Sequence, residues 1–262
     1  MNETFDWHGW QLRTDSLYFE AGGDEVLLSP TDLLLAIDET GIEDLSDPKY
    51  PLFGLGGCGV LAGQYLDLIE RPWTRLKEKH FGSMFVPLHA AELLGATPQQ
   101  LAALGEFFRR NQFFRLAALT TDKTEMHPSI HPYPSVAMVL MRQLAEISEI
   151  VPFRRVAVVL ESSQRTDGLA WNTFKDFQMW RTDGSAREEV DVIFLRGSKR
   201  LRYSALEVAD FVMHAAGTAV REERLGKRML DRKDFAAVFG SVPEHLVHFL
   251  CLRSFGFCSR TS

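Results

Sequence analysis

Apolar and polar positions along the chain predict a mixture of strands and helices. Continuous apolar or β-branched runs are typical of buried strands, and such runs occupy 32–38, 52–63, 112–119, 154–163 and 190–197. Apolar residues that recur every three or four positions are typical of helices, and this pattern occupies 64–81, 97–111, 135–148, 166–180 and 204–223. The prolines of segment 120–134 predict a loop.

The order of these elements predicts the fold class. Strands follow one another early in the chain and alternate with helices later, which favours a single α/β or α+β domain. We expect an α/β domain with a mixed central sheet flanked by helices, spanning residues 31–224. Residues 1–30 alternate loosely and predict short strands or an N-terminal extension, and residues 225–262 predict a basic, helical C-terminal extension.

Composition narrows the function classes. The 262 residues are 45% hydrophobic and 24% charged, with a formal net charge of −6, so the chain is not expected to coat nucleic acid indiscriminately. Its three cysteines, Cys58, Cys251 and Cys258, are widely spaced and predict reduced thiols in the cytoplasm. The acidic, polar start predicts no signal peptide, and no apolar run approaches the ~20 residues of a membrane span.

Three apolar elements carry carboxylates at or near their ends. The strand at 32–38 ends in Asp38, which Glu39 follows; another strand ends in Glu161; and Asp210 interrupts an apolar helix. Glu207 precedes Asp210 by one helical turn. A buried charge needs a partner or a metal, and no Lys or Arg lies close in sequence. A solvated turn, a helix cap or a structural ion pair is the alternative at each position.

Electrostatics favours a cation if these acids meet. Two carboxylates about 4 Å apart repel by about 4 kcal/mol at an effective dielectric constant of about 20. A divalent ion removes that cost, and Mg²⁺ or Mn²⁺ prefers oxygen ligands and retains waters for phosphate chemistry. Two such ions about 4 Å apart can promote phosphodiester cleavage.

Short motifs give the chain a resemblance. The segments "AIDETG", "FGLGGCGV", "VVLESSQ" and "SALEVADFVMHAAG" resemble the uncharacterised family numbered 3800 among domains of unknown function. The resemblance covers most of residues 32–222. It implies a ribonuclease H-like fold and a metal-dependent nuclease activity.

The resemblance also implies site residues. Asp38 would lie on the first, central strand, Glu161 on the neighbouring fourth strand, and Asp210 on the helix that closes the site. Glu39 would support the ligands. The family also shows a His and an acid after the first long helix, which implies that Glu92 is a further ligand and that His89 contacts a phosphate or leaving group; a surface helix with a solvated acid is the alternative for these two. The sequence departs from the family pattern at Thr40, where Ser is usual, and at Glu207, where Gln is usual; the added charge at Glu207 would either supply a further metal ligand or weaken the site.

Other motifs offer competing interpretations. Gly54, Gly56 and Gly59 have the spacing of a dinucleotide-binding loop, which would make the protein a nucleotide-binding oxidoreductase. No acidic strand follows at the required distance, so glycines at bends or close backbone contacts are the alternative. His127 and His131 have zinc-like helical spacing, but prolines surround them. Ser129, Ser162 and Ser163 lack a glycine elbow.

Basic residues suggest the substrate. Four of them lie close to the Asp210 helix in sequence and are candidate phosphate contacts: Arg196, Lys199, Arg200 and Arg202. Solvated ion pairs are the alternative. The sequence thus predicts a metal-dependent nuclease that uses Mg²⁺ or Mn²⁺ on nucleic acid and does not span a membrane. The second hypothesis is a catalytically silent module of the same fold that binds nucleic acid or a protein.

Overall fold

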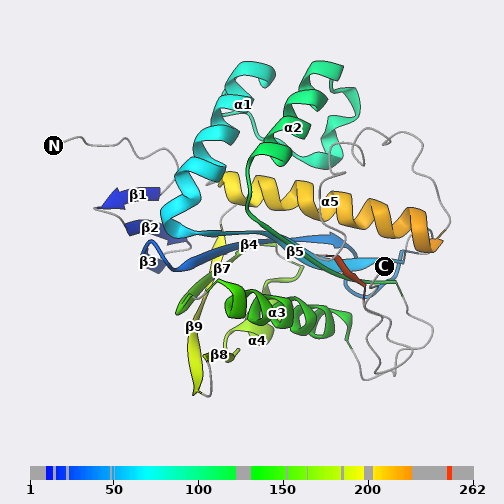
Figure 1. The fold of residues 1–262 in the computed structure, drawn as a ribbon. Coiled ribbons are helices and arrows are strands. Elements are labelled where there is room, and N and C mark those ends of the chain that lie inside the picture. The colour runs from blue at the N-terminus through cyan, green and yellow to red at the C-terminus, as the bar shows by residue number, and fades with distance from the viewer. Residues whose placement is uncertain are drawn as a thin grey trace.

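The computed structural model describes residues 10–13, 16–21, 24–47, 49, 51–121, 131–151, 153–163, 165–183, 186–197, 203–225 and 247–249. Within these ranges a mixed sheet is flanked by helices on both faces (Figure 1). The predicted α/β class with a mixed, helix-flanked sheet is therefore confirmed. None of the described helices is both long and apolar enough to cross a membrane.

The main sheet has the strand order β10-β6-β5-β4-β7-β9-β8. Its strands are β4 (Leu33–Gly41), β5 (Phe53–Leu61), β6 (Phe114–Thr120), β7 (Arg155–Glu161), β8 (Met179–Asp183), β9 (Ala186–Gly197) and β10 (Val247–Phe249). Strands β4, β7 and β9 run parallel, whereas β5 is antiparallel to both of its neighbours. The carboxyl ends of β4, β7 and β9 therefore share one edge of the sheet.

Helices cover the two faces unequally (Figure 1). One face carries α5 (Ser204–Leu225), with α1 (Arg71–Phe81) and α2 (Pro98–Arg110) beyond it; the other carries α3 (Pro132–Ile150) and α4 (Asp167–Phe174). Short helical segments at Ala62–Gln64, Leu66–Glu70 and Ala90–Gly95 complete the connections. We call the two sides the α5 face and the α3 face.

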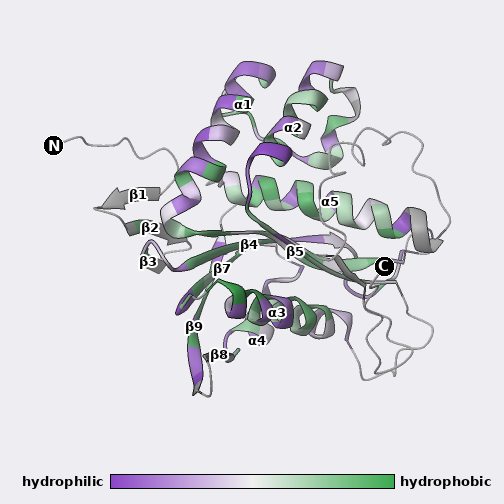
Figure 2. Cartoon of the chain, viewed as in Figure 1, coloured by the Kyte–Doolittle hydropathy of each residue, from purple (hydrophilic) through white to green (hydrophobic). Residues whose placement is uncertain are grey.

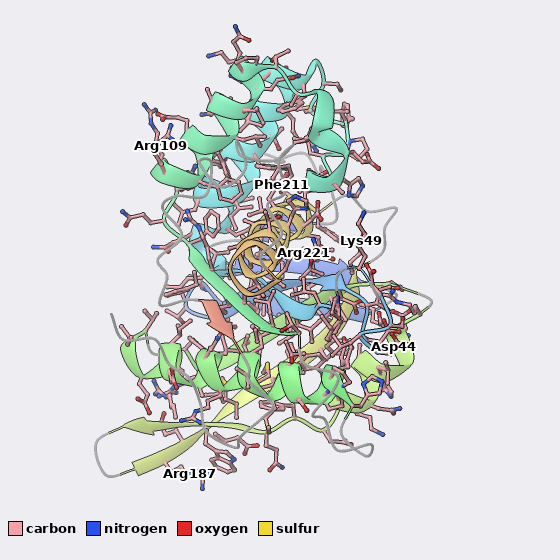
Figure 3. All side chains as sticks on the ribbon, turned by 90° about the vertical axis from the view of Figure 1, so that its right-hand side faces the viewer. Asp44, Lys49, Arg109, Arg187, Phe211 and Arg221 are labelled. Atoms are coloured by element: carbon pink, nitrogen blue, oxygen red, sulfur yellow. The ribbon has the colours of Figure 1, made fainter. Side chains whose placement is uncertain are left out.

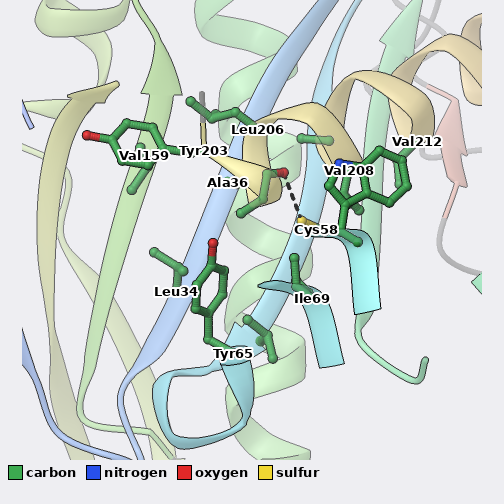
Figure 4. Packing of buried hydrophobic residues seen from close by; sticks show 14 of the residues in the cluster. Leu34, Ala36, Cys58, Tyr65, Ile69, Val159, Tyr203, Leu206, Val208 and Val212 are labelled. Carbon is green, nitrogen blue, oxygen red and sulfur yellow. Dashed lines mark hydrogen bonds between the residues drawn. The ribbon is translucent and has the colours of Figure 1, made fainter. Parts of the chain in front are cut away.

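Side-chain alternation along β4 builds a core on each face. Leu34 and Ala36 pack in the cluster that contains the buried side of α5, whereas Leu33, Leu35 and Ile37 pack with α3. Apolar colouring is concentrated where the helices meet the sheet (Figure 2). Figure 4 shows the α5-face cluster, in which the Cys58 thiol donates to the Ala205 carbonyl at 3.3 Å.

The glycine-rich strand β5 allows α5 to approach closely. A Cβ at Gly56 would lie 2.6 Å from the Met213 sulfur, and one at Gly57 would lie 2.7 Å from the Ala209 methyl group. Gly54, Gly56 and Gly59 all lie within the strand instead of leading into a helix. The dinucleotide-loop interpretation is therefore wrong, because it requires a strand-to-helix turn at these glycines.

Several boundaries differ from the sequence predictions. α3 begins at Pro132, inside the predicted loop, because proline is tolerated in the first turn of a helix and the His131 side chain accepts the Tyr133 N–H. The predicted helix at 166–180 ends at Phe174, and Met179 and Trp180 instead start β8, which pairs with β9.

The two extensions contain strands. β1 (Trp10–Arg13), β2 (Ser16–Ala21) and β3 (Asp24–Leu28) form a separate antiparallel sheet, which places Leu17 and Leu28 in the α5-face core. In the C-terminal extension, residues 247–249 form β10 instead of helix, and nearly all of the rest lies outside the described residues.

Candidate functional site

The candidate site begins where β4 and β7 stop pairing. Their parallel ladder ends at Ile37 and Leu160, while β4 continues to pair with β5 through Asp38, whose cross-strand partner is Gly56. On each strand the first residue past the end of the ladder is acidic. It is Asp38 on β4 and Glu161 on β7. The sequence folds this way because the apolar run of each strand ends there.

Alternation places these two acids on the same face. Asp38 follows Leu34 and Ala36 at two-residue spacing, and Glu161 follows Val159 in the same way; all three apolar residues belong to the α5-face core. Asp210 lies on α5 itself. Acids from three separate elements therefore converge on one region.

Asp38 and Asp210 lie beside each other, close enough for each carboxyl group to change the pKa of the other, and the Ala90 N–H donates to Asp210 Oδ2 at 2.7 Å. Burial and then the negative charge of Asp210 hold the pKa of Asp38 well above its usual range. Burial also raises the pKa of Asp210, while the Ala90 N–H, the His89 charge and Asp38 act in the opposite direction. The surrounding core thus opposes the ionisation of both acids, and the charge of Asp210 further opposes that of Asp38.

Three further side chains surround this carboxyl pair. Glu161 is close enough for its charge to raise the pKa of Asp38, and Glu92 has the same effect on Asp210. His89 Nδ1 lies 4.0 Å from Asp210 Oδ2, and its side chain is 47% exposed. His89 immediately precedes the short helix Ala90–Gly95, which contains Glu92. One turn therefore places His89, the Ala90 N–H and Glu92 near Asp210.

The arrangement falls short of a complete metal centre. Among the described residues, no three His, Cys, Asp or Glu side chains are close enough to hold one metal ion as they stand. The donors that do meet are carboxylate oxygens, which suit Mg²⁺ or Mn²⁺. A cation between Asp38 and Asp210 would relieve their mutual repulsion, and Glu161, whose charge acts on Asp38, is the candidate for a third carboxylate.

Glu207 has a different role from the one predicted. Its Oε2 accepts from Trp73 Nε1 at 2.6 Å and from Lys77 Nζ at 2.9 Å, and both charged side chains of this ion pair are buried. Burial raises the pKa of Glu207, and Lys77 opposes that rise. Residues three apart lie only about 60° apart around a helix, yet Glu207 contacts Trp73 and Lys77 of α1 while Asp210 contacts the Ala90 N–H beside Asp38. In this structure Glu207 therefore forms an ion pair with Lys77.

The Glu39 side chain points away from that of Asp38. As the residue after Asp38 on a strand, it points to the α3 face, where its Oε2 lies 3.5 Å from Arg165 Nη2. Arg165 Nε also lies 3.0 Å from Glu43 Oε2, so one guanidinium links the end of β4 to the following loop. Glu39 acts on the pKa of Asp38 through its charge and its backbone, but its carboxylate is directed away from Asp38, which corrects the role predicted for it.

The predicted phosphate contacts are only partly within the described residues. Arg196 is exposed on β9, with its guanidinium carbon 5.7 Å from the Trp171 ring centroid. Lys199, Arg200 and Arg202 lie outside the described residues, as do His127 and Ser129. Ser162 donates to Asp167 Oδ2 at 2.8 Å, at the start of α4.

Sequence reasoning missed the residues that partner the acids. Lys77 and Trp73 lie about 130 positions from Glu207, and Ala90 contributes only its backbone N–H to Asp210. One signal was present: Trp73 and Lys77 are four apart, so Lys77 falls on the apolar side of an amphipathic helix. A lysine in that position indicates a buried acidic partner.

Comparison with known proteins adds no assignment. No protein-family model matches the chain, and no curated protein matches it.

Proposed function

We propose that the protein is a metal-dependent phosphodiesterase that cleaves nucleic acid, with Asp38, Asp210 and Glu161 as ligands of Mg²⁺ or Mn²⁺. The observation that carries the proposal is the contact between the Asp38 and Asp210 carboxyl groups, which come from a strand and a distant helix. A fold gains nothing in stability from two buried acids that face each other. Functional sites are where such an arrangement is retained.

The resemblance noted above supports the same assignment. It implies one acid on the central strand, one on the neighbouring strand and one on the closing helix. Asp38 on β4, Glu161 on the adjacent β7 and Asp210 on α5 have this distribution. We propose a cytoplasmic location for the protein, as the widely spaced cysteines predict. Cys58, the cysteine within the described residues, is a free, buried thiol.

The residues of the chain would divide the work as follows. Asp38 and Asp210 would hold the cation through their carboxylate oxygens, with both groups ionised while the cation is bound. Ala90 fixes the Asp210 carboxylate through its N–H. His89, half-exposed beside Asp210, gives a proton to the leaving oxygen. When bound, the cation neutralises phosphate charge and lowers the pKa of a coordinated water.

The test combines metal binding with cleavage. Titration calorimetry with Mn²⁺ should detect binding to the intact protein, and labelled DNA and RNA oligonucleotides should be cleaved when Mn²⁺ or Mg²⁺ is added. We expect Asp38→Asn and Asp210→Asn to lower both the affinity for Mn²⁺ and the cleavage rate by at least about 100-fold, as the loss of a metal ligand predicts.

Glu39→Gln is the matched control, because Glu39 adjoins Asp38 in the chain but points to the other face. It should keep both metal binding and cleavage. Equal loss in Glu39→Gln and Asp38→Asn, or cleavage that survives in Asp38→Asn, would contradict the proposal.

The second candidate is a catalytically silent module that binds nucleic acid or a protein. One observation favours it: no three-ligand group is formed among the described residues. A silent module would bind its partner equally well in the wild type and in Asp38→Asn, with or without Mn²⁺.

A further inference from the structure

A tryptophan and an arginine form an exposed platform at the edge of the sheet. Trp171 on α4 is 47% exposed despite its large apolar ring, and the Arg196 guanidinium carbon lies 5.7 Å from the ring centroid. Phe194 packs against Trp171 at a centroid distance of 6.3 Å, and it stacks on the buried Phe174 at 5.3 Å. We call Trp171 and Arg196 the edge platform. The stack beneath it holds the exposed ring in place.

The edge platform lies close to the carboxyl pair but on the other face. In the ladder between β7 and β9, Arg196 pairs with Leu160, and Gly197 pairs with Glu161. From strand spacings, the backbones of Arg196 and Glu161 are therefore about 6 Å apart. Leu160 belongs to the α3-face core, so Arg196 faces that side while Glu161 faces α5. A chain that crosses this edge of the sheet would touch both.

The chemistry of the edge platform suits a nucleotide. The exposed indole can stack on a base, and the guanidinium beside it can contact the adjoining phosphate. Lys199, Arg200 and Arg202 continue the basic character in the sequence, on a chain whose net charge is −6. Bases within a duplex already stack on their neighbours, so a stacking platform favours an unpaired strand.

A second tryptophan–arginine pair provides an internal comparison. Trp180 is 38% exposed, and the Arg187 guanidinium carbon lies 4.8 Å from its ring centroid. Arg187 lies toward the end of the β8–β9 hairpin that extends from the body (Figure 3), about 30 Å along β9 from Arg196. Trp180 pairs across the hairpin with Glu189, whose negative charge offsets the positive charge of Arg187 on this face.

We propose that the edge platform stacks a base of single-stranded DNA or RNA and guides the strand over the sheet edge toward Asp38 and Asp210. The guidance rests on the proposed nuclease function, whereas the binding does not depend on cleavage.

Binding is measured first, without divalent ions, so that cleavage cannot interfere. Fluorescence anisotropy would follow labelled single-stranded DNA, single-stranded RNA and the matched duplex, each about 15 nucleotides long. The wild type should bind a single strand more tightly than the duplex. Trp171→Ala should weaken single-strand binding by about 5- to 150-fold, while Trp180→Ala should leave it within about twofold. The comparison of DNA with RNA identifies the preferred strand.

Two further variants distinguish the loss of a stacking contact from a folding defect in Trp171→Ala. Trp171→Phe keeps an aromatic face and should keep most of the affinity. Arg196→Gln changes an exposed residue and should reduce the slope of log affinity against log salt by about 0.7, the loss of one phosphate contact with a single strand.

The outcomes separate this inference from the nuclease proposal. Binding that depends on Trp171 without cleavage in Mn²⁺ supports the edge platform and contradicts the nuclease. Cleavage and binding that are both unaffected by Trp171→Ala overturn the edge platform alone. Equal weakening by Trp180→Ala, or competition by an acidic peptide as effective as that by the oligonucleotide, also overturns it.

Discussion

Glu207 and Asp210 lie one turn apart on the same helix and have opposite surroundings. Glu207 accepts from Trp73 and Lys77 in a buried ion pair, whereas Asp210 lies beside another acid, Asp38, with the Ala90 N–H and the half-exposed His89 as its other partners. In the first environment the protein compensates a buried negative charge; in the second it concentrates negative charge. The difference indicates which acid stabilises the fold and which is available to bind a ligand.

The largest effect is expected at the compensated acid. Lys77→Ala leaves the Glu207 carboxylate buried without its cation, and it should lower the free energy of unfolding by about 3–5 kcal/mol. Denaturant unfolding followed by circular dichroism measures this change. The double variant Lys77→Met with Glu207→Gln removes both charges and keeps an acceptor for Trp73, so it should recover most of the loss. No recovery would mean that the ion pair is not the cause.

Added cation should act only at the uncompensated acid. A ligand at 100 times its Kd stabilises a protein by about 2.7 kcal/mol, so saturating Mn²⁺ should raise the Tm of the wild type. The double variant at Lys77 and Glu207 should show the same rise, because it leaves Asp210 intact. Asp210→Asn should lose the rise; an undiminished rise in that variant would place the cation elsewhere.

The smallest effect concerns stability without metal. Asp38→Asn should stabilise the metal-free protein at neutral pH by about 0.5–2 kcal/mol, because it removes a carboxyl group whose ionisation the fold opposes. The pKa of Asp38 is raised in the folded state. Its ionisation therefore lowers stability as the pH rises from the unfolded pKa, about 3.9, through the higher folded pKa.

This last gain should consequently disappear below about pH 4, where Asp38 is protonated in both states. Thermal unfolding of the wild type and Asp38→Asn across a pH series tests the sign. A gain that persists in acid would show that it does not come from the ionisation of Asp38. A destabilisation at neutral pH would show that another group compensates the Asp38 carboxylate.

The sequence was informative where local pattern determines structure. The apolar runs located β4, β7 and α5, and the acids at 38, 161 and 210 were identified because they interrupt or end such runs. Two-residue alternation was also sufficient to separate Asp38 from Glu39, since neighbours on a strand point to opposite faces. The sequence interpretation grouped them only because they are adjacent.

The remaining features depend on contacts between distant segments. The Lys77–Glu207 pair joins residues 130 positions apart, and the Arg165 contacts with Glu39 and Glu43 join a helix-cap loop to the end of β4. The first two residues of β8, Met179 and Trp180, were predicted as the end of a helix. This short strand has little pattern of its own, and its pairing with β9 stabilises it. Such pairings follow from the packed chain and cannot be derived from one segment.

The glycines of β5 affect how closely Asp38 and Asp210 approach each other. Gly56 lies directly across from Asp38, and at both Gly56 and Gly57 a single added carbon would collide with α5. Each added carbon would also collide with a carbonyl oxygen of a neighbouring strand, that of Leu116 for Gly56 and that of Ala36 for Gly57, so it would strain the sheet as well as the packing of the helix that carries Asp210. The absence of side chains at these two positions thus lets the strand and the helix hold the two acids close together.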